Sequence, residues 1–156
     1  MRMTYLVLAR IIAVLIVVQA ATIAWAVSGV FTWVVEGGNT LDKSVVEGWD
    51  AEPPTFEGAL GSGLHFFFIG QAAIPLAGLL LLIVAFFAKV PRGVLLAAVV
   101  VVLIAVQILL GINSQGTPTF GLLHGLNAFI LFGATMAAAM AAKNAGAADE
   151  APAPVA

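Results

Sequence analysis

Residues 93–142 read GVLLAAVVVVLIAVQILLGINSQGTPTFGLLHGLNAFILFGATMAAAMAA, a stretch without a charged side chain. A helix that crosses the hydrocarbon core of a bilayer needs roughly 20 apolar residues, at about 1.5 Å of rise each. The stretch is therefore long enough for two crossings, and the polar run Asn113-Ser114-Gln115-Gly116-Thr117-Pro118-Thr119 divides it. The sequence predicts transmembrane helices over residues 93–112 and 120–142.

Two further uncharged stretches, residues 11–35 and 58–88, predict spans over residues 8–34 and 60–88. The chain has 156 residues, of which 62% are hydrophobic and 9% charged, and its mean hydropathy is +1.12. A soluble domain of this length needs more polar surface than that composition supplies. We therefore expect an all-α integral membrane protein, with residues 1–143 forming a four-helix up-down-up-down bundle whose main partner is the lipid bilayer.

The charged residues are distributed unequally between the two ends of the predicted helices. Five of the six basic residues flank the ends that four alternating helices place on one side: Arg2, Arg10, Lys89, Arg92 and Lys143. The loop between the first two spans is acidic, with Lys43 as its only basic residue: Glu36, Asp42, Glu47, Asp50, Glu52 and Glu57. Basic residues concentrate on the cytoplasmic side of membrane proteins. This distribution predicts a multi-pass protein of the cytoplasmic (inner) membrane with both termini in the cytoplasm.

The first predicted span has an alternative interpretation. Arg2, Arg10 and the apolar run up to Ala24-Trp25-Ala26 resemble a cleavable signal peptide, which would leave three helices. The apolar run continues to Val35, which is longer than a typical signal core and favours a retained helix.

Residues 144–156 are rich in Ala and Pro and predict a disordered cytoplasmic tail.

Several classes of function lack their sequence features. The chain has no cysteine, which excludes disulfides, thiolate metal sites and thioether-linked haem. It also lacks a phosphate-binding glycine loop, a nucleophile–base pair, paired intramembrane carboxylates and a basic nucleic-acid patch. We therefore assign no catalytic residue, expect no nucleic-acid partner, and do not expect the chain to be an enzyme.

A short pattern occurs in both halves of the chain. Val18-Gln19 in the first span is followed by Leu64-His65 at the start of the second, and Val106-Gln107 in the third by Leu123-His124 at the start of the fourth. The pattern predicts two helical hairpins in a parallel internal repeat, related by an axis along the membrane normal.

His65 and His124 are the only histidines, and both lie about one turn below the outer end of a predicted span. In such a bundle the second and fourth helices are diagonal partners, with axes roughly 12–14 Å apart. Two inward imidazoles on that diagonal can bind the iron of a haem b between them. Zinc is less favoured, because two histidines supply only half of a four-ligand site. Hydrogen-bonded histidines and proton or ion handling remain alternatives.

Small and polar residues accompany His124. Gly121 and Gly125 form a G-x-x-x-G pattern around it and would admit a flat macrocycle, or would serve helix packing alone. Asn127 follows His124 by three residues and could hydrogen-bond a haem propionate or a group that orients a ligand. These three residues complete the predicted cofactor site.

With Leu64-His65 and Leu123-His124 at the start of helices two and four, residues 8–142 resemble one four-helix half of haem A synthase. They also resemble small bacterial four-helix membrane proteins of unknown activity with the same histidine pattern. The resemblance implies a haem-holding bundle. The catalytic half of that family has a glutamate one turn before its first histidine, where this chain has Gly61 and Ser62. The outer-loop cysteine pair and the second half are also absent, so the resemblance does not imply haem hydroxylation.

Two functional hypotheses follow. The first is a small b-type cytochrome or haem-handling protein that transfers electrons, because iron with both axial positions filled has no open site for oxygen. The alternative is a cofactor-free accessory or scaffold subunit of a larger respiratory or membrane complex, or of a homo-oligomer. A transporter is disfavoured, because the predicted spans contain no buried charged residue.

Overall fold

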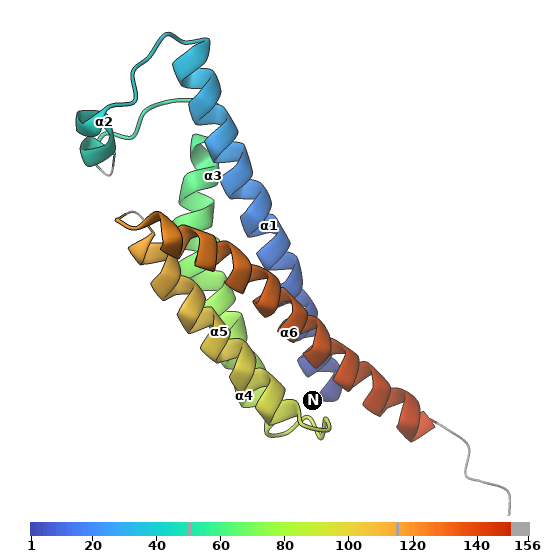
Figure 1. Cartoon of the computed structure of the whole chain (residues 1–156). Helices are drawn as coiled ribbons and strands as arrows, with labels where there is room; N and C mark the ends of the chain where they lie inside the picture. Colours follow the sequence, from blue (N-terminus) through green and yellow to red (C-terminus); the bar gives the residue numbers. More distant parts are fainter. Residues whose placement is uncertain (50, 115, 151–156) are drawn as a thin grey trace, which may run out of the picture. The chain divides into compact units, whose positions relative to one another are not determined.

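The computed structural model describes residues 1–49, 51–114 and 116–150, and it is all-α over these residues (Figure 1). The elements in chain order are α1 (Arg2–Val35), α2 (Lys43–Gly48), α3 (Ala59–Gly63), the π-helix η1 (Leu64–Ala73), α4 (Ile74–Ala85), α5 (Gly93–Asn113) and α6 (Pro118–Glu150). The predicted all-α class with four long apolar helices is confirmed.

Among the described residues, four helices are long and apolar enough to cross a membrane: Arg2–Val35, Ala59–Ala85, Gly93–Asn113 and Pro118–Ala147. They correspond to the four predicted spans, and the second consists of α3, η1 and α4 in succession. Large apolar side chains along them are exposed, including Phe67 at 62% and Phe129 at 79%. Water would disfavour an apolar surface of this extent, whereas acyl chains match it. The chain is a small multi-pass membrane protein.

The chain divides into two compact units. The larger unit comprises Met1–Ile16 and Gln71–Ala156, and the smaller unit comprises Val17–Gly70. Helix α1 and the π-helix η1 each begin in one unit and end in the other.

In the larger unit, α5 packs against both α4 and α6. Ala97, Val100 and Ile104 form the buried stripe of α5, at the three- and four-residue spacing that keeps side chains on one helix face. A Cβ on Gly78 of α4 would lie 2.5 Å from Ile104 Cδ1, so the glycine allows α4 and α5 to approach closely. This contact is the small-residue packing that membrane helices use.

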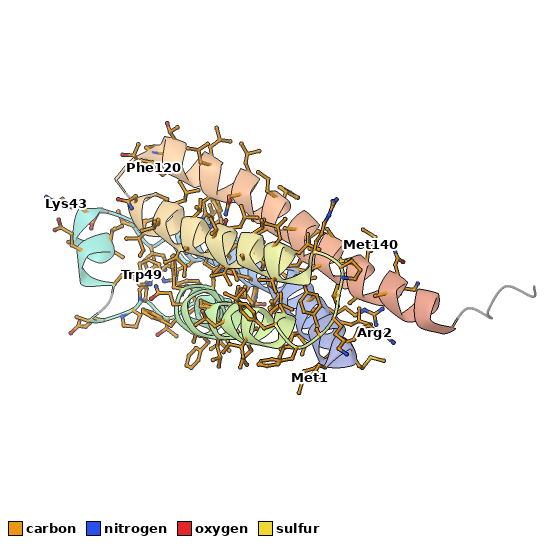
Figure 2. The ribbon with its side chains drawn as sticks, turned by 90° about the horizontal axis from the view of Figure 1, so that it is seen from below. Met1, Arg2, Lys43, Trp49, Phe120 and Met140 are labelled. Carbon is orange, nitrogen blue, oxygen red and sulfur yellow. The ribbon has the colours of Figure 1, made fainter. Side chains whose placement is uncertain are left out.

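One end of the larger unit is held together by two contacts from the start of α1. The fully buried Tyr5 donates its hydroxyl hydrogen to the carbonyl oxygen of Gly93, the first residue of α5, at 2.9 Å. Arg2 donates from Nη1 to the carbonyl oxygen of Ala145 in α6 at 3.3 Å, and Figure 2 shows Arg2 beside the last turns of α6. The start of α1, the start of α5 and the last turns of α6 therefore lie at the same end of this unit.

We expect Tyr5→Phe to lower the free energy of unfolding by about 0.6 kcal/mol, the average for hydrogen bonds between membrane helices, and by no more than about 1.7 kcal/mol, their maximum. The substitution removes the donor to Gly93 while keeping the buried ring. Reversible unfolding in mixed detergent micelles measures the change. Thr4→Val, which removes an exposed hydroxyl from the same turn, is the control. Equal stability of the Tyr5→Phe and control variants would show that the hydroxyl does not stabilise this end.

In the smaller unit, α3 packs on α1 through glycine. A Cβ on Gly61 would collide with the Thr22 carbonyl oxygen of α1. The loop between α1 and α3 contains the short helix α2. The Asp42 carboxylate caps α2 by accepting hydrogen bonds from the backbone N–H groups of Ser44 and Val45 at 2.9 and 3.1 Å. The Ser44 hydroxyl, and then the Val45 amide, lower the pKa of Asp42, so this cap is charged near neutral pH.

The C-terminal segment differs from the prediction. Residues 144–150, expected to belong to a disordered tail, continue α6 as helix to Glu150. The physical reason is the alanine-rich composition after Lys143, since alanine has the highest helix propensity and α6 supplies the preceding turns. Residues 151–156 of the predicted tail lie outside the described residues.

Helix α1 continues without interruption through Ala24-Trp25-Ala26, the segment that resembles a signal-peptide cleavage site.

Candidate functional site

His65, the second residue of η1, forms a reciprocal pair with Gln19 of α1 inside the smaller unit. The His65 ring nitrogen Nδ1 lies 3.0 Å from the Gln19 backbone carbonyl oxygen. In return, Gln19 donates from Nε2 to the backbone carbonyl oxygen of His65 at 3.3 Å. The glutamine that the sequence pattern singled out therefore contacts the histidine through both its main chain and its side chain.

The π-helical backbone of η1 is the setting of this pair. A π-turn widens the helix by one residue, and such turns occur frequently at functional sites. A Cβ on Gly70 would lie 2.5 Å from the His65 carbonyl oxygen and 2.6 Å from Gln19 Nε2. Only glycine leaves room for the Gln19 amide at this point. Gly70 is thus a residue of the site that the sequence did not identify.

His124 of α6 makes the corresponding contact inside the larger unit. Its Nδ1 lies 2.9 Å from the backbone carbonyl oxygen of Gln107 in α5. A Cβ on Gly111 would lie 3.0 Å from His124 Cε1 and 3.1 Å from Nδ1. The ring therefore lies against the backbone of α5, and Gly111 provides the space. Gly111 follows Gln107 by one helical turn, and this spacing alone could have placed the two residues on the same face of α5.

Asn127 lies one turn further along α6 and binds Gln107. Its Nδ2 donates to Gln107 Oε1 at 2.6 Å and to the Leu103 carbonyl oxygen at 3.0 Å. Both side chains are buried, Asn127 at 6% and Gln107 at 9% exposure. These contacts place Asn127 against the glutamine whose backbone carbonyl bonds His124, and its role beside a cofactor stays a prediction.

The two histidines occupy equivalent places in their own spans. Each is six residues after the first residue of its span, since 65 − 59 = 6 from Ala59 and 124 − 118 = 6 from Pro118. That offset is about 9 Å along a helix. Each histidine bonds the backbone carbonyl of the glutamine in a Val-Gln pair on the preceding long helix. The same local arrangement thus occurs once in each unit.

These contacts determine what each imidazole can do. A carbonyl oxygen can only accept a hydrogen bond, so Nδ1 must be the donor in both rings. A neutral histidine protonated on Nδ1 has its lone pair on Nε2. A backbone carbonyl that accepts from one ring nitrogen fixes the tautomer and raises the basicity of the other, as is usual for histidine ligands of metals. In its neutral form, each ring therefore has its proton on Nδ1 and its lone pair on Nε2, which is the tautomer of an Nε2 metal ligand.

The two glycines beside His124 differ from Gly61, Gly70 and Gly111. Within the described part of the chain, a Cβ on Gly125 would meet nothing within 4 Å, and one on Gly121 would meet only Ser114 Cβ at 3.8 Å. Both glycines are exposed. Neither is therefore required by a close contact between helices of this chain, which leaves their predicted role beside a cofactor as a proposal.

A metal site with three or more protein ligands would be a different kind of site. Within the described ranges, no cluster of three or more His, Cys, Asp or Glu side chains could hold a metal ion. No protein-family model, no curated protein and no solved structure matches this chain.

Proposed function

We propose that this chain is a small b-type cytochrome of the bacterial cytoplasmic membrane, with His65 and His124 as the two axial ligands of one haem b. The observation that best supports the proposal is the matched hydrogen bonding of the two rings. Nδ1 of each donates to a glutamine carbonyl, at 3.0 Å from His65 and 2.9 Å from His124. Two neutral imidazoles complete the coordination of a haem iron, whereas a structural zinc site needs two further ligands.

The residues around the rings have orienting roles in this proposal. The carbonyl oxygens of Gln19 and Gln107 hold the imidazole planes and increase electron donation from Nε2. Asn127 holds Gln107, and Gly111 admits the His124 ring. A haem ligated in this way supplies one-electron transfer. A haem held by both histidines would favour electron transfer or haem handling over oxygen chemistry.

The proposed orientation follows from the charges. The larger unit gathers the start of α1, the start of α5 and the last turns of α6 at one end, close in sequence to Arg2, Arg92 and Lys143. The positive-inside rule makes that end cytoplasmic. Both termini are then cytoplasmic, the bundle is up-down-up-down, and both histidines lie toward the outer face.

The resemblance to one half of haem A synthase remains part of this proposal, without its hydroxylation activity. Gly61 stands at the place of the family's catalytic glutamate, and its Cβ position is occupied by the Thr22 carbonyl oxygen. A longer side chain would not fit there without movement of the helices. The chain would therefore hold haem and exchange electrons with a partner, such as a larger respiratory complex.

Titration of the purified chain with haemin in mild detergent tests the proposal. We expect saturation at one haem per chain and sharp α and β bands on reduction. A folded protein that remains colourless during the titration would contradict the proposal. It would favour the cofactor-free accessory subunit instead.

We expect Gly125→Leu to weaken haem binding while leaving insertion unchanged. If Gly125 lines the cofactor, the added side chain overpacks the site at a cost of about 1–3 kcal/mol, or roughly 5- to 150-fold in affinity. Insertion should tolerate the change, because leucine is favourable in a membrane helix. The measurement is haem affinity together with melting temperature of the haem-free protein.

Gly133→Leu is the matched control, because Gly133 also has open space around its Cβ position and lies eight residues deeper in α6. Unchanged haem affinity in Gly125→Leu would show that this face does not line the cofactor. Equal losses in both variants would assign the effect to the helix rather than to the site.

A further inference from the structure

The larger unit has a basic end, which we define by the exposed residues Arg10, Lys89, Arg92 and Lys143. The Tyr5–Gly93 and Arg2–Ala145 hydrogen bonds hold three of its segments together: the start of α1, the start of α5 next to Arg92, and the part of α6 that follows Lys143. Among the described residues, none of the four side chains that define the basic end forms a hydrogen bond or an ion pair. The only acidic residues described in this unit, Asp149 and Glu150, end α6.

The loop between α4 and α5 presents two of these cations from a fixed backbone. Lys89 and Arg92 have positive φ angles of 52° and 56°, a conformation that residues other than glycine and asparagine seldom adopt. Between them, Val90 is buried at 8% exposure, and its carbonyl oxygen accepts a hydrogen bond from the Gly93 N–H at 2.9 Å. The buried valine and the turn hold the loop, so both long side chains start from defined positions.

The surroundings of this loop specify the kind of partner. A loop that joins two transmembrane helices lies at the level of the lipid headgroups. An arginine binds a phosphate oxygen pair through its planar guanidinium, and a lysine supplies a compact charge beside it. A zwitterionic headgroup would add its own cation to a group of four cations, whereas an anionic one would neutralise them.

We propose that the basic end binds an anionic phospholipid, with Lys89 and Arg92 as the main contacts to its phosphate and Lys143 and Arg10 adding charge. Arg10 lies about 12 Å into α1 from Arg2, and its long side chain can extend back along the helix to the headgroup level. This proposal does not depend on haem binding.

Native mass spectrometry of the full chain in detergent tests it, by titration with phosphatidylglycerol and with phosphatidylcholine. We expect phosphatidylglycerol to be retained at lower concentration. Lys89→Asn with Arg92→Asn should remove most of the preference, by roughly 25-fold at about fivefold per basic residue. Asparagine tolerates the left-handed backbone, so this double variant removes the charges and keeps the loop.

Two controls separate the effect of charge at positions 89 and 92 from the effect of side-chain identity and from the effect of losing a charge elsewhere. Lys89→Arg with Arg92→Lys keeps both charges and should keep the preference. Lys43→Asn removes the basic residue of the loop between α1 and α3 and should also leave it unchanged. If the asparagine variant fails to insert, the comparison of the two lipids on the wild-type protein is sufficient. Equal retention of phosphatidylglycerol and phosphatidylcholine by the wild-type protein would overturn the proposal. Displacement of phosphatidylglycerol by millimolar inorganic phosphate would also overturn it, because the site would then recognise a free anion.

Discussion

Under the proposed haem ligation, replacement of either histidine by alanine is expected to abolish a low-spin haem spectrum. His65→Ala and His124→Ala would each remove one of the two proposed iron ligands, so the haem should become high-spin or should be lost on purification. Loss of residues that merely orient a metal ligand costs about 10- to 100-fold in metal affinity. Loss of the ligand itself should exceed that range. The measurements are the optical spectrum and the haem content per chain.

Gln71→Ala is the control, because it removes an exposed polar side chain from η1 without removing a histidine. It should keep the wild-type spectrum. A low-spin spectrum that survives in either histidine variant would show that the missing residue is not a ligand. Survival in only one variant would identify a single ligand and would require a second from elsewhere.

Gly111→Val is expected to displace the His124 ring and to destabilise the packing of α6 on α5. A Cβ at this position would lie 3.0 Å from His124 Cε1, and the two branches of valine would lie further into the ring. Overpacking of this kind costs about 1–3 kcal/mol. We expect a lower melting temperature of the haem-free protein and, because the ring must leave the Gln107 carbonyl, weaker haem binding. Gly116→Ala, at a glycine with open space around it, is the control.

A double-mutant cycle with His124→Ala separates this effect from general helix disruption. If the valine collides with the imidazole, Gly111→Val should be nearly neutral for stability when His124 is already alanine. The losses of unfolding free energy caused by the two substitutions should then differ from additivity by about 1–3 kcal/mol. Additive losses of stability would show that Gly111 does not provide space for the ring.

The sequence was sufficient for the elements that depend on hydrophobic runs. The four spans follow from uncharged segments of membrane length, because a chain in lipid must satisfy its backbone groups within helices. The positions of His65 and His124 near one end of their spans also follow from counting residues. The sequence did not predict the extension of α6 to Glu150, because polar and acidic residues obscured the helix propensity of the alanines.

The contacts of the histidines could not be predicted from the sequence. Gln19 and Gln107 were noticed for their side chains, but the histidines bond their backbone carbonyls, a group that every residue has. The roles of Gly70 and Gly111 depend on which side chain of a neighbouring segment lies against them, and no periodicity within one helix gives that information. Asn127 could be placed near His124, whereas its bond to Gln107 required the packing of α5 on α6.

The most direct test of the account is electron paramagnetic resonance of the oxidised, haem-loaded wild-type protein in mild detergent. Two histidine ligands with donating Nδ1–H groups predict a low-spin ferric signal of the kind that two imidazoles produce, accounting for all of the bound haem. A dominant high-spin ferric signal, in a protein whose helix content and haem stoichiometry are intact, would contradict ligation by both His65 and His124.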